Sequence, residues 1–264
     1  MPTNLVNRMK NFFYRSARIH FFFLGCAMAV ASTAGDLIQT IETVKPSIVG
    51  IGTFLQTRSP AVSFVGTGFV VGDGLSVVTN AHVIPGAFDN EHKEILRVTV
   101  GNANGTEFRD AALVVVDKLH DLALLRISGL PLPAMKVGDS GTVREGQILA
   151  FTGFPLTGVL GFHHVTHRGL IAAITPVVTQ APSSRSLDVK AILQLEHSIY
   201  NVFQLDGTAY PGGSGSPLYD PETGVVYGVI NKVVNATKEA AITNPSGITY
   251  AVPSNFVREL MTKK

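Results

Sequence analysis

Short apolar runs, separated by residues that favour turns, follow one another along most of the 264-residue chain. Runs of this kind, rich in Val, Ile and Phe and bounded by Gly, Pro, Asn or Asp, predict β-strands. Asp73-Gly74 and Asn104-Gly105 are dipeptides of the hairpin type. The clearest runs are 47–54, 68–71, 76–79, 96–100, 112–116 and 122–127, followed by 147–152, 165–175, 191–195, 202–205, 225–230 and 248–252.

Helical periodicity is confined to short segments. An amphipathic stretch follows Asp36, and a helix is predicted over 254–262, with Ser254 as its cap and Lys263 and Lys264 at its negative end. Many strands with one terminal helix predict an all-β protein of the barrel or sandwich type. Periodicity alone leaves that choice open.

Residues 1–31 have the features of a signal peptide. Four basic residues precede an acid-free apolar run from Phe21 to Ala31, and small residues suit cleavage near 31/32 or 34/35. A membrane anchor is the alternative, but a spanning helix needs roughly 20 apolar residues. Cys26, the single cysteine, leaves a lipoprotein as a further reading. We expect an exported bacterial protein, periplasmic or extracellular, with no stable membrane insertion once the signal is removed.

Charge argues against a nucleic-acid partner. The formal net charge of +2 becomes −2 when the four basic groups of residues 1–31 are removed, and no Lys/Arg cluster remains. A hydrophobic content of 45% with only 15% charged residues excludes a disordered chain and provides enough apolar surface for a core.

Two segments in the first half carry acid–base candidates. His82 follows the apolar run 77–79 directly, where a loop can hold its imidazole over a cleft and let it exchange protons with a hydroxyl. Asp121 leads into the run 122–127, and a carboxylate buried there would pair well with an imidazole N–H. Either residue alone is more often an ordinary loop histidine or strand-start aspartate. Asp117 is the rival for the acidic role.

The third segment, 210–218, surrounds Ser214 with glycines and serines. Small neighbours allow a tight turn from which the Ser214 hydroxyl protrudes, and they allow backbone N–H groups to converge on a developing oxyanion. A Gly/Ser-rich turn without function is the alternative for this segment taken by itself.

The order His, Asp, Ser at these spacings is the chymotrypsin order. Together with the segments 136–140, 146–155, 165–169, 224–230 and 250–255, it makes the chain resemble trypsin-like serine proteases of the high-temperature-requirement (HtrA/Deg) type. The resemblance covers about residues 44–260. It implies a protease domain over 36–264 with two six-stranded antiparallel β-barrels, about 45–130 and 140–253, and the C-terminal helix.

The family's roles carry over where the motif matches. The resemblance implies Ser214 as the nucleophile, His82 as the general base and acid, and Asp121 as the group that orients His82. Backbone N–H groups of Gly212, Gly213 and Ser214 would form the oxyanion hole. Protein or peptide substrates are implied, with no cofactor and no metal, and a role in envelope protein quality control.

Some residues depart from the family pattern. Gly213 and Ser216 stand where Asn and Gly are common, and Thr208 is neutral where trypsin has an acidic pocket base, which argues against cleavage after Lys or Arg. The Gly-Ser-Pro ending at Ser216 resembles glutamyl endopeptidases, but Ile230 stands where those enzymes place a substrate-reading histidine. We expect a small or medium aliphatic P1 residue, with the pocket lined by Thr208, Ala209, Ile230, Asn231 and Lys232.

Other interpretations stay open. The chain ends directly after the terminal helix, so no PDZ module is expected, and the oligomeric state is undetermined. His163, His164 and His167 suggest a metal site, but acids are distant in sequence and a surface loop is the preferred reading. A non-catalytic, chaperone-like protein with the nucleophile loop in an inactive shape is the main alternative function, and an esterase on the same triad is a third.

Overall fold

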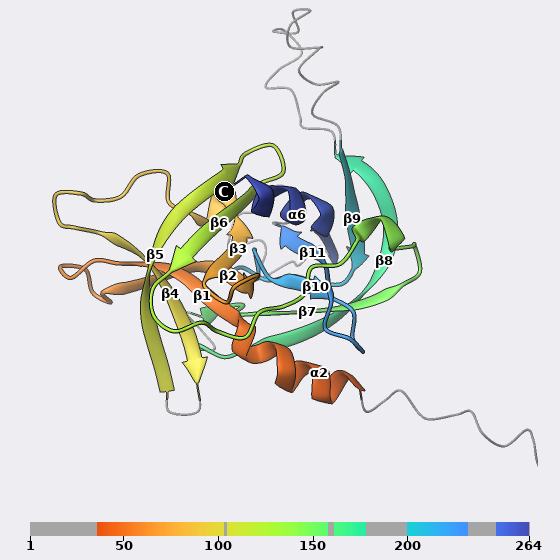
Figure 1. The fold of residues 1–264 in the computed structure, drawn as a ribbon, viewed down its shortest axis with the longest axis horizontal. Coiled ribbons are helices and arrows are strands. Elements are labelled where there is room, and N and C mark those ends of the chain that lie inside the picture. Colours follow the sequence, from red (N-terminus) through yellow and green to blue (C-terminus); the bar gives the residue numbers. More distant parts are fainter. Residues whose placement is uncertain (1–35, 103–104, 158–160, 178–199, 232–246, 264) are drawn as a thin grey trace, which may run out of the picture. The chain divides into compact units, whose positions relative to one another are not determined.

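The computed structural model describes residues 36–102, 105–157, 161–177, 200–231 and 247–263. They belong to one compact unit, 36–264. Two closed six-stranded antiparallel β-barrels follow each other along the chain, and a short helix ends it (Figure 1). The predicted fold class is therefore confirmed. The predicted signal peptide and the predicted strand 191–195 lie outside the described residues.

Barrel 1 closes in the order β1-β2-β3-β6-β5-β4. Its central pairing joins β3 to β6, with Asn80 opposite Leu122. Because His82 comes two residues after Asn80 and Asp121 comes one residue before Leu122, this register brings the two candidates together at one end of the strand pair. The strands are β1 (Ile48–Phe54), β2 (Val62–Val71), β3 (Ser76–Asn80), β4 (Ile95–Asn102), β5 (Gly105–Asp117) and β6 (Leu122–Ile127).

Barrel 2 closes in the order β10-β11-β12-β9-β8-β7. Its strands are β7 (Ile148–Gly153), β8 (Val165–Val177), β9 (Tyr200–Asp206), β10 (Pro217–Tyr219), β11 (Val226–Asn231) and β12 (Ile248–Pro253). The strand β10 was not predicted, because three residues beginning with proline are too short to show an alternating pattern. It pairs with both β7 and β11 and starts three residues after Ser214.

The apolar runs are buried on both faces of their strands. In β1, Val49 and Ile51 join the cluster inside barrel 1, whereas Ile48 joins a cluster shared by both barrels. Successive side chains of a strand point to opposite faces. Alternate residues of a continuous apolar run therefore fill the barrel interior, and the residues between them pack against the other barrel. A third cluster, which includes Phe151 and Leu205, fills barrel 2.

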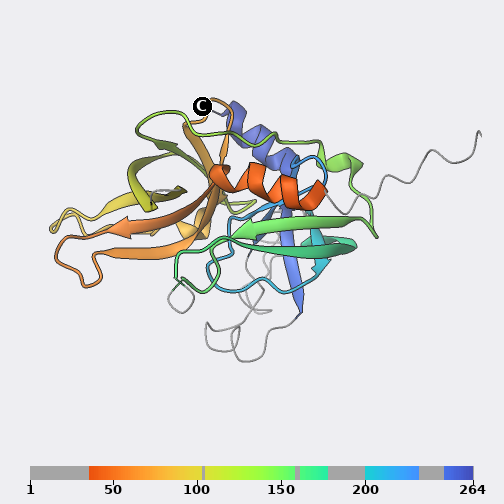
Figure 2. The ribbon, with the colours of Figure 1, turned by 90° about the horizontal axis from the view of Figure 1, so that it is seen from below.

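The N-terminal helix α2 (Asp36–Val44) and the 3-10 turn η2 (Lys45–Ser47) lead into β1. The α2 helix nevertheless packs on the turn between β10 and β11, since the Thr40 hydroxyl donates to the Glu222 carbonyl at 3.1 Å (Figure 2). There are two more 3-10 turns. The first, η3 (Ala81–Val83), contains His82, and the second, η4 (Ser140–Thr142), lies in the segment between β6 and β7.

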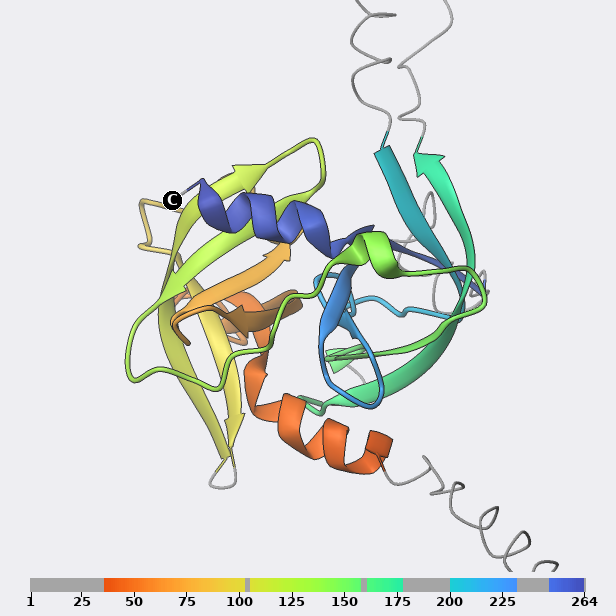
Figure 3. The same ribbon diagram turned by 45° about the vertical axis from the view of Figure 1, so that its right-hand side comes forward.

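The C-terminal helix α6 (Ser254–Thr262) crosses from the end of β12 back toward barrel 1 (Figure 3). Two of its own residues, Val257 and Leu260, are buried in the cluster shared by both barrels. Ser254 does not cap the helix, contrary to the prediction: Pro253 holds the N-cap position, and the Ser254 hydroxyl donates to Gly138 O at 2.9 Å. The Ser254 hydroxyl is therefore directed to a partly buried carbonyl of the linker between the barrels rather than to the helix N-terminus. No helix in the described part of the chain has the length and apolar character needed to cross a bilayer.

Candidate active site

His82 lies in η3, directly after β3, and one carboxylate fixes it at two points. Its ring Nδ1 is 2.6 Å from Oδ2 of Asp121, and its backbone N–H donates to Oδ1 of Asp121 at 2.9 Å. A carboxylate can only accept, so Nδ1 carries the proton and Nε2 is the basic atom of the neutral ring. The side chain of His82 keeps 35% of its surface exposed, which leaves room for a reactant.

Asp121 adopts a left-handed backbone conformation, with a φ of +53°. Aspartate tolerates this region better than most residues, at a cost on the order of 1 kcal/mol. Two donors hold its carbonyl oxygen at 3.0 Å, the Asn80 side-chain amide and the Ala81 backbone N–H. The β3–β6 pairing therefore keeps Asp121 in the conformation that presents its carboxylate to His82.

Asp117, the sequence rival for the acidic role, has a different partner. Its Oδ2 is 2.9 Å from Nδ1 of His120 and 3.3 Å from the Lys263 ammonium. Burial raises the pKa of the Asp117 carboxyl, but the hydrogen bonds from His120 and Lys263 outweigh this, and the pKa is lowered. The His120 ring stacks on Phe256 of α6 with centroids 3.7 Å apart. Asp117 thus anchors the loop that precedes Asp121 to the C-terminal helix.

Two consecutive turns present Ser214. In the first, the Gly213 N–H donates to Tyr210 O at 2.9 Å, with Pro211 in the second position and Gly212 at a φ of +94° in the third. Proline followed by a residue with positive φ is the signature of a type II turn. Only glycine fits there, because a Cβ on Gly212 would lie 2.5 Å from the Phe154 carbonyl oxygen.

The second turn runs from Gly213 to Ser216 and repeats the pattern. The Ser216 N–H donates to Gly213 O at 3.1 Å, and Gly215 in the third position has a φ of +87°. Ser214 occupies the second position, at the corner of the turn, where a side chain projects away from the backbone. The prediction of a tight, glycine-dependent turn around Ser214 agrees with this geometry.

Every carbonyl from Pro211 to Ser214 accepts a hydrogen bond. The Leu156 N–H donates to Pro211 O at 2.8 Å, and the Ser216 N–H donates to Gly213 O. The Thr67 hydroxyl donates to Gly212 O at 2.7 Å, and the Thr67 N–H donates to Ser214 O at 2.8 Å. Because the C=O and N–H of a trans peptide point in opposite directions, fixing each carbonyl also fixes the N–H that follows it.

Two backbone donors of this segment remain available. The N–H groups of Gly212 and Ser214 have no acceptor among the described residues. The Gly213 N–H differs, since it closes the first turn onto Tyr210 O and is engaged in this structure. Two free donors on either side of an engaged one are the arrangement that an oxyanion requires.

The turns around Ser214 and the 3-10 turn that contains His82 lie on the same side of β2. A Cβ on Gly66 would be 2.7 Å from the Val83 side chain and 3.0 Å from the Ser214 carbonyl oxygen. Ser214 and Val83, the residue that follows His82, therefore both lie against Gly66 of β2. No hydrogen bond joins Ser214 Oγ to His82 within the described ranges. Catalytic hydrogen bonds are often long without substrate and shorten when it binds.

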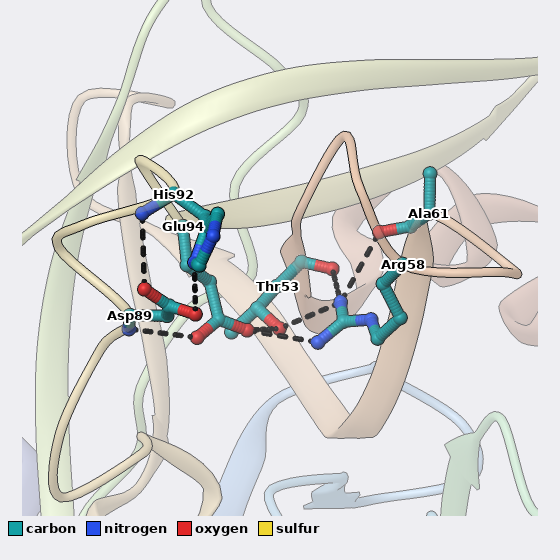
Figure 4. A network of polar contacts seen from close by, with 6 residues as sticks. All are labelled: Thr53, Arg58, Ala61, Asp89, His92 and Glu94. Atoms are coloured by element: carbon teal, nitrogen blue, oxygen red, sulfur yellow. Dashed lines mark hydrogen bonds and ion pairs between the residues drawn. The ribbon is translucent and has the colours of Figure 1, made fainter.

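A polar network fixes the loop after His82 (Figure 4). Oε1 of Glu94 accepts from the Thr53 hydroxyl at 2.5 Å and from Arg58 at 2.9 Å, and Oε2 accepts from the Asp89 N–H at 3.1 Å. The Thr53 hydrogen bond is the main reason that the pKa of Glu94 is lowered. The network ties the loop between η3 and β4 to the β1–β2 hairpin.

With this geometry established, comparisons with known proteins are decisive. The profile of the trypsin-like peptidase domain matches residues 66–229. The chain belongs to the trypsin-like peptidases. The match spans the segments that contain His82, Asp121 and Ser214.

The chain is similar to serine proteases of the HtrA type. Serine protease HTRA1B of Danio rerio is 29% identical over 86% of this chain and 41% of its own length. The probable periplasmic serine endoprotease DegP-like of Pseudomonas fluorescens is 27% identical over 97% of this chain and 54% of its own length. The chain thus spans about half, or less, of the length of these curated relatives.

Solved structures agree on the fold. An HtrA-type protease AlgW with tripeptide has a TM-score of 0.60 and 23% identity, covering 86% of this chain and 62% of that chain. The same protease with decapeptide has a TM-score of 0.61 and 22% identity, covering 86% and 66%.

Four of the five predicted pocket residues lie within the described residues. The Ala209 N–H donates to the hydroxyl of Thr249, a buried residue of β12, at 2.8 Å, which fixes the chain beside Thr208. Ile230 is buried in the barrel 2 core, and its backbone bonds to Gly215 and Ser216. Asn231 ends β11 and is partly exposed, whereas Lys232 lies outside the described residues.

The three histidines of the cluster lie in different surroundings: His163 is exposed in the loop before β8, as the surface-loop reading expects, whereas His164 and His167 are partly buried. His167 lies in β8 and stacks on Phe151 with centroids 5.1 Å apart, while His164 Nε2 is 3.1 Å from Ile48 O. Burial lowers the pKa of both rings. Within the described ranges, no three His, Cys, Asp or Glu side chains come together as metal ligands.

Sequence reasoning missed two supporting residues, Thr67 and His120. Each lies beside a motif residue: Thr67 in the Gly-Thr-Gly segment that precedes His82, and His120 next to Asp121. A threonine between two glycines, at the start of the predicted run 68–71, could have drawn attention, because strands disfavour glycine.

Proposed function

We propose that the protein is an exported serine endopeptidase that hydrolyses peptide bonds through an acyl-enzyme on Ser214. The observation that carries the proposal is the pair of hydrogen bonds that His82 donates to Asp121, combined with two unengaged N–H groups around Ser214 in a trypsin-like peptidase. These are an oriented base and the donors for an oxyanion.

In the proposed mechanism, His82 Nε2 takes the proton of the Ser214 hydroxyl as Oγ attacks the scissile carbonyl carbon. Asp121 keeps Nδ1 protonated and stabilises the imidazolium. The Gly212 and Ser214 N–H groups bind the oxyanion, and His82 then protonates the leaving amine. Water repeats the sequence on the acyl-enzyme and releases Ser214.

The substrate and the compartment are parts of the same proposal. AlgW structures carry a tripeptide or a decapeptide, which supports an extended peptide as the substrate class. A relative named as periplasmic aligns with 97% of this chain, which supports export and a role in envelope protein quality control. A small or medium aliphatic residue is proposed at P1, near Thr208 and Ala209.

The test is labelling with a fluorophosphonate, followed by intact mass and peptide mapping. Wild-type protein should gain one adduct, mapped to Ser214, and should cleave an unfolded protein substrate. Ser214→Ala should lose the adduct and reduce turnover by on the order of 10⁶, the size of the effect in subtilisin. His82→Ala should prevent labelling although Ser214 is retained.

The alternative functions give different results. Folded wild-type protein that binds unfolded substrate but neither labels nor cleaves would identify a non-catalytic, chaperone-like protein. Turnover of ester but not amide substrates, lost in Ser214→Ala, would identify an esterase.

A further inference from the structure

Thr67 belongs to β2 of barrel 1, but most of its polar atoms serve barrel 2. Its side chain is completely buried. Its N–H donates to Ser214 O at 2.8 Å, its hydroxyl donates to Gly212 O at 2.7 Å, and the same hydroxyl accepts from the Phe154 N–H at 3.0 Å. One residue of the first barrel therefore satisfies three backbone groups of the second.

Both carbonyls that Thr67 holds belong to the two turns around Ser214, residues 210–216, which we call the nucleophile turn. They are the carbonyls of Gly212 and Ser214, and each lies in the same residue as one free donor of the candidate oxyanion hole. The donor N–H groups belong to the peptide units that precede Gly212 and Ser214, and Thr67 holds the peptide units that follow them. The two units meet at the Cα atom of each residue, so a rotation of a held unit would change the ψ angle of that residue and the path of the turn that carries its N–H. Thr67 thus restrains both donors without contacting the space between them.

Thr67 is itself held firmly. The hydroxyl of Thr79, a buried residue of β3, donates to Thr67 O at 2.7 Å. Gly215 packs so closely on this carbonyl that a Cβ on Gly215 would overlap it. A Cβ on Gly153 would lie 2.8 Å from the Thr67 hydroxyl oxygen. Backbone from barrel 2 is therefore pressed directly against the threonine, with no room for a bridging water.

We propose that Thr67 is a positioning residue that keeps the oxyanion donors of Gly212 and Ser214 in their catalytic orientation. The proposal rests on the function proposed above, with Ser214 as the nucleophile. The hydroxyl, rather than the volume of the side chain, performs this role, because the hydroxyl makes two of the three cross-barrel hydrogen bonds. Its effect should fall on the transition state, where the donors are used, and little on substrate binding.

Thr67→Val tests the proposal with little change of shape. Valine leaves Gly212 O and the Phe154 N–H buried without partners, and the turn must shift to satisfy them. We expect kcat to fall about 10-fold to 100-fold, because small displacements of catalytic groups have effects of this size, while KM stays within about twofold. Thr67→Ser restores the hydroxyl and should return kcat to within about threefold of wild type.

A peptide boronate provides a readout that a purely structural role would not affect. It forms a tetrahedral adduct that uses the oxyanion donors, so its inhibition constant should rise by about the same factor as kcat/KM falls. A product-like peptide acid, bound in the ground state, should keep its inhibition constant.

Thr40→Val is the matched control. Thr40 is also a buried threonine whose hydroxyl donates to a backbone carbonyl of barrel 2, that of Glu222, which lies outside the turns around Ser214. This variant should lower the melting temperature without changing kcat. If Thr67→Val does not fold, Thr67→Cys replaces it, because a thiol of similar size is a much weaker donor.

The outcomes separate the two proposals. If wild-type protein has no Ser214-dependent turnover, the proposed function fails, and this inference fails with it. If wild-type protein is active and folded Thr67→Val has wild-type kcat and boronate affinity, the positioning role alone is overturned. A fall in kcat that Thr67→Ser does not reverse would also overturn it, since the hydroxyl would then be irrelevant.

Discussion

The two barrels contribute to the site by different physical means. Every ion pair among the described residues has its acid in barrel 1, including Asp121 with His82 and Asp117 with His120. The barrel 2 contribution consists instead of two backbone turns, glycines at positive φ, and closely packed peptides. In the function proposed above, charged side chains orient the base, and backbone geometry orients the nucleophile.

This difference determines how each half can fail. The barrel 1 half depends on the identity of a few side-chain atoms, so a conservative change can abolish its chemistry and leave the fold intact. The barrel 2 half depends on space, so adding a single methyl group disrupts both chemistry and fold. It also depends on barrel 1, because Thr67 supports it from outside. Four substitutions test this contrast.

Asp121→Asn should have the largest effect, and only on chemistry. An amide at this position would present a donor to His82 and favour the wrong ring tautomer. In chymotrypsin-like enzymes the equivalent change lowers kcat by about 10⁴. We expect a loss of this order in kcat/KM with an unchanged melting temperature. Asp110→Asn, which breaks the exposed Arg97 pair of the same barrel, is the matched control and should retain full activity.

Gly215→Ala should damage fold and activity together. A left-handed conformation costs a non-glycine residue about 1–2 kcal/mol, and here the new Cβ would also overlap Thr67 O and lie 2.5 Å from the Thr79 hydroxyl. We expect a loss of at least about 3 kcal/mol in the free energy of unfolding, measured by urea denaturation. Gly146→Ala supplies the control, since Gly146 has a φ of +86° with nothing within 4 Å of its Cβ position. Equal losses in both variants would mean that packing against Thr67 contributes nothing.

The pH dependence of stability should reveal how barrel 2 treats a buried base. Burial lowers the pKa of His167 below its ordinary value of 6.5. As the pH falls, His167 is therefore protonated in the unfolded chain before it is protonated in the folded chain, which favours unfolding. Stability should therefore decrease from about pH 7.5 to about pH 5, and His167→Phe should reduce this slope. Melting temperatures at each pH provide the measurement, with His163→Gln as the control. A slope that is unchanged in His167→Phe would show that His167 protonates as easily in the folded state.

Ser216→Ala should have the smallest effect. The Ser216 hydroxyl is buried without a partner in the described structure, so its removal should change the free energy of unfolding by less than about 1 kcal/mol, with stabilisation the expected sign. Thr152→Val is the comparison, because that buried hydroxyl is 2.7 Å from the Tyr219 hydroxyl and 2.8 Å from that of Thr166. Thr152→Val should cost about 1–2 kcal/mol. A large loss in Ser216→Ala would indicate a hidden partner for its hydroxyl.

Much of this architecture could be predicted from local pattern. The runs at 47–54 and 122–127 agree closely with β1 and β6, because both faces of these strands are buried and the apolar signal is continuous. The strand β10 and the role of Ser254 could not be predicted in this way. The first is fixed by its neighbours β7 and β11, and the second by the linker carbonyl of Gly138, all of which are distant in sequence.

The site divides along the same line. Residues with reactive side chains could be identified from order and spacing, whereas their supports could not. Nothing near Thr67 in sequence indicates that its hydroxyl meets Gly212, 145 residues away. The preference for Asp121 over Asp117 came from the family resemblance alone, and its physical reason, the β3–β6 register that brings Asp121 to His82, is visible only in the structure.

The path of α6 has a consequence for biosynthesis. Phe256 and Lys263 brace the His120–Asp117 loop beside Asp121, yet they are synthesised after every strand of the two barrels. A nascent chain from which only barrel 1 has left the ribosome contains His82 and Asp121. It lacks Ser214 and the two bracing residues of the C-terminal segment. The order of synthesis therefore delays the complete candidate site until α6 has been made.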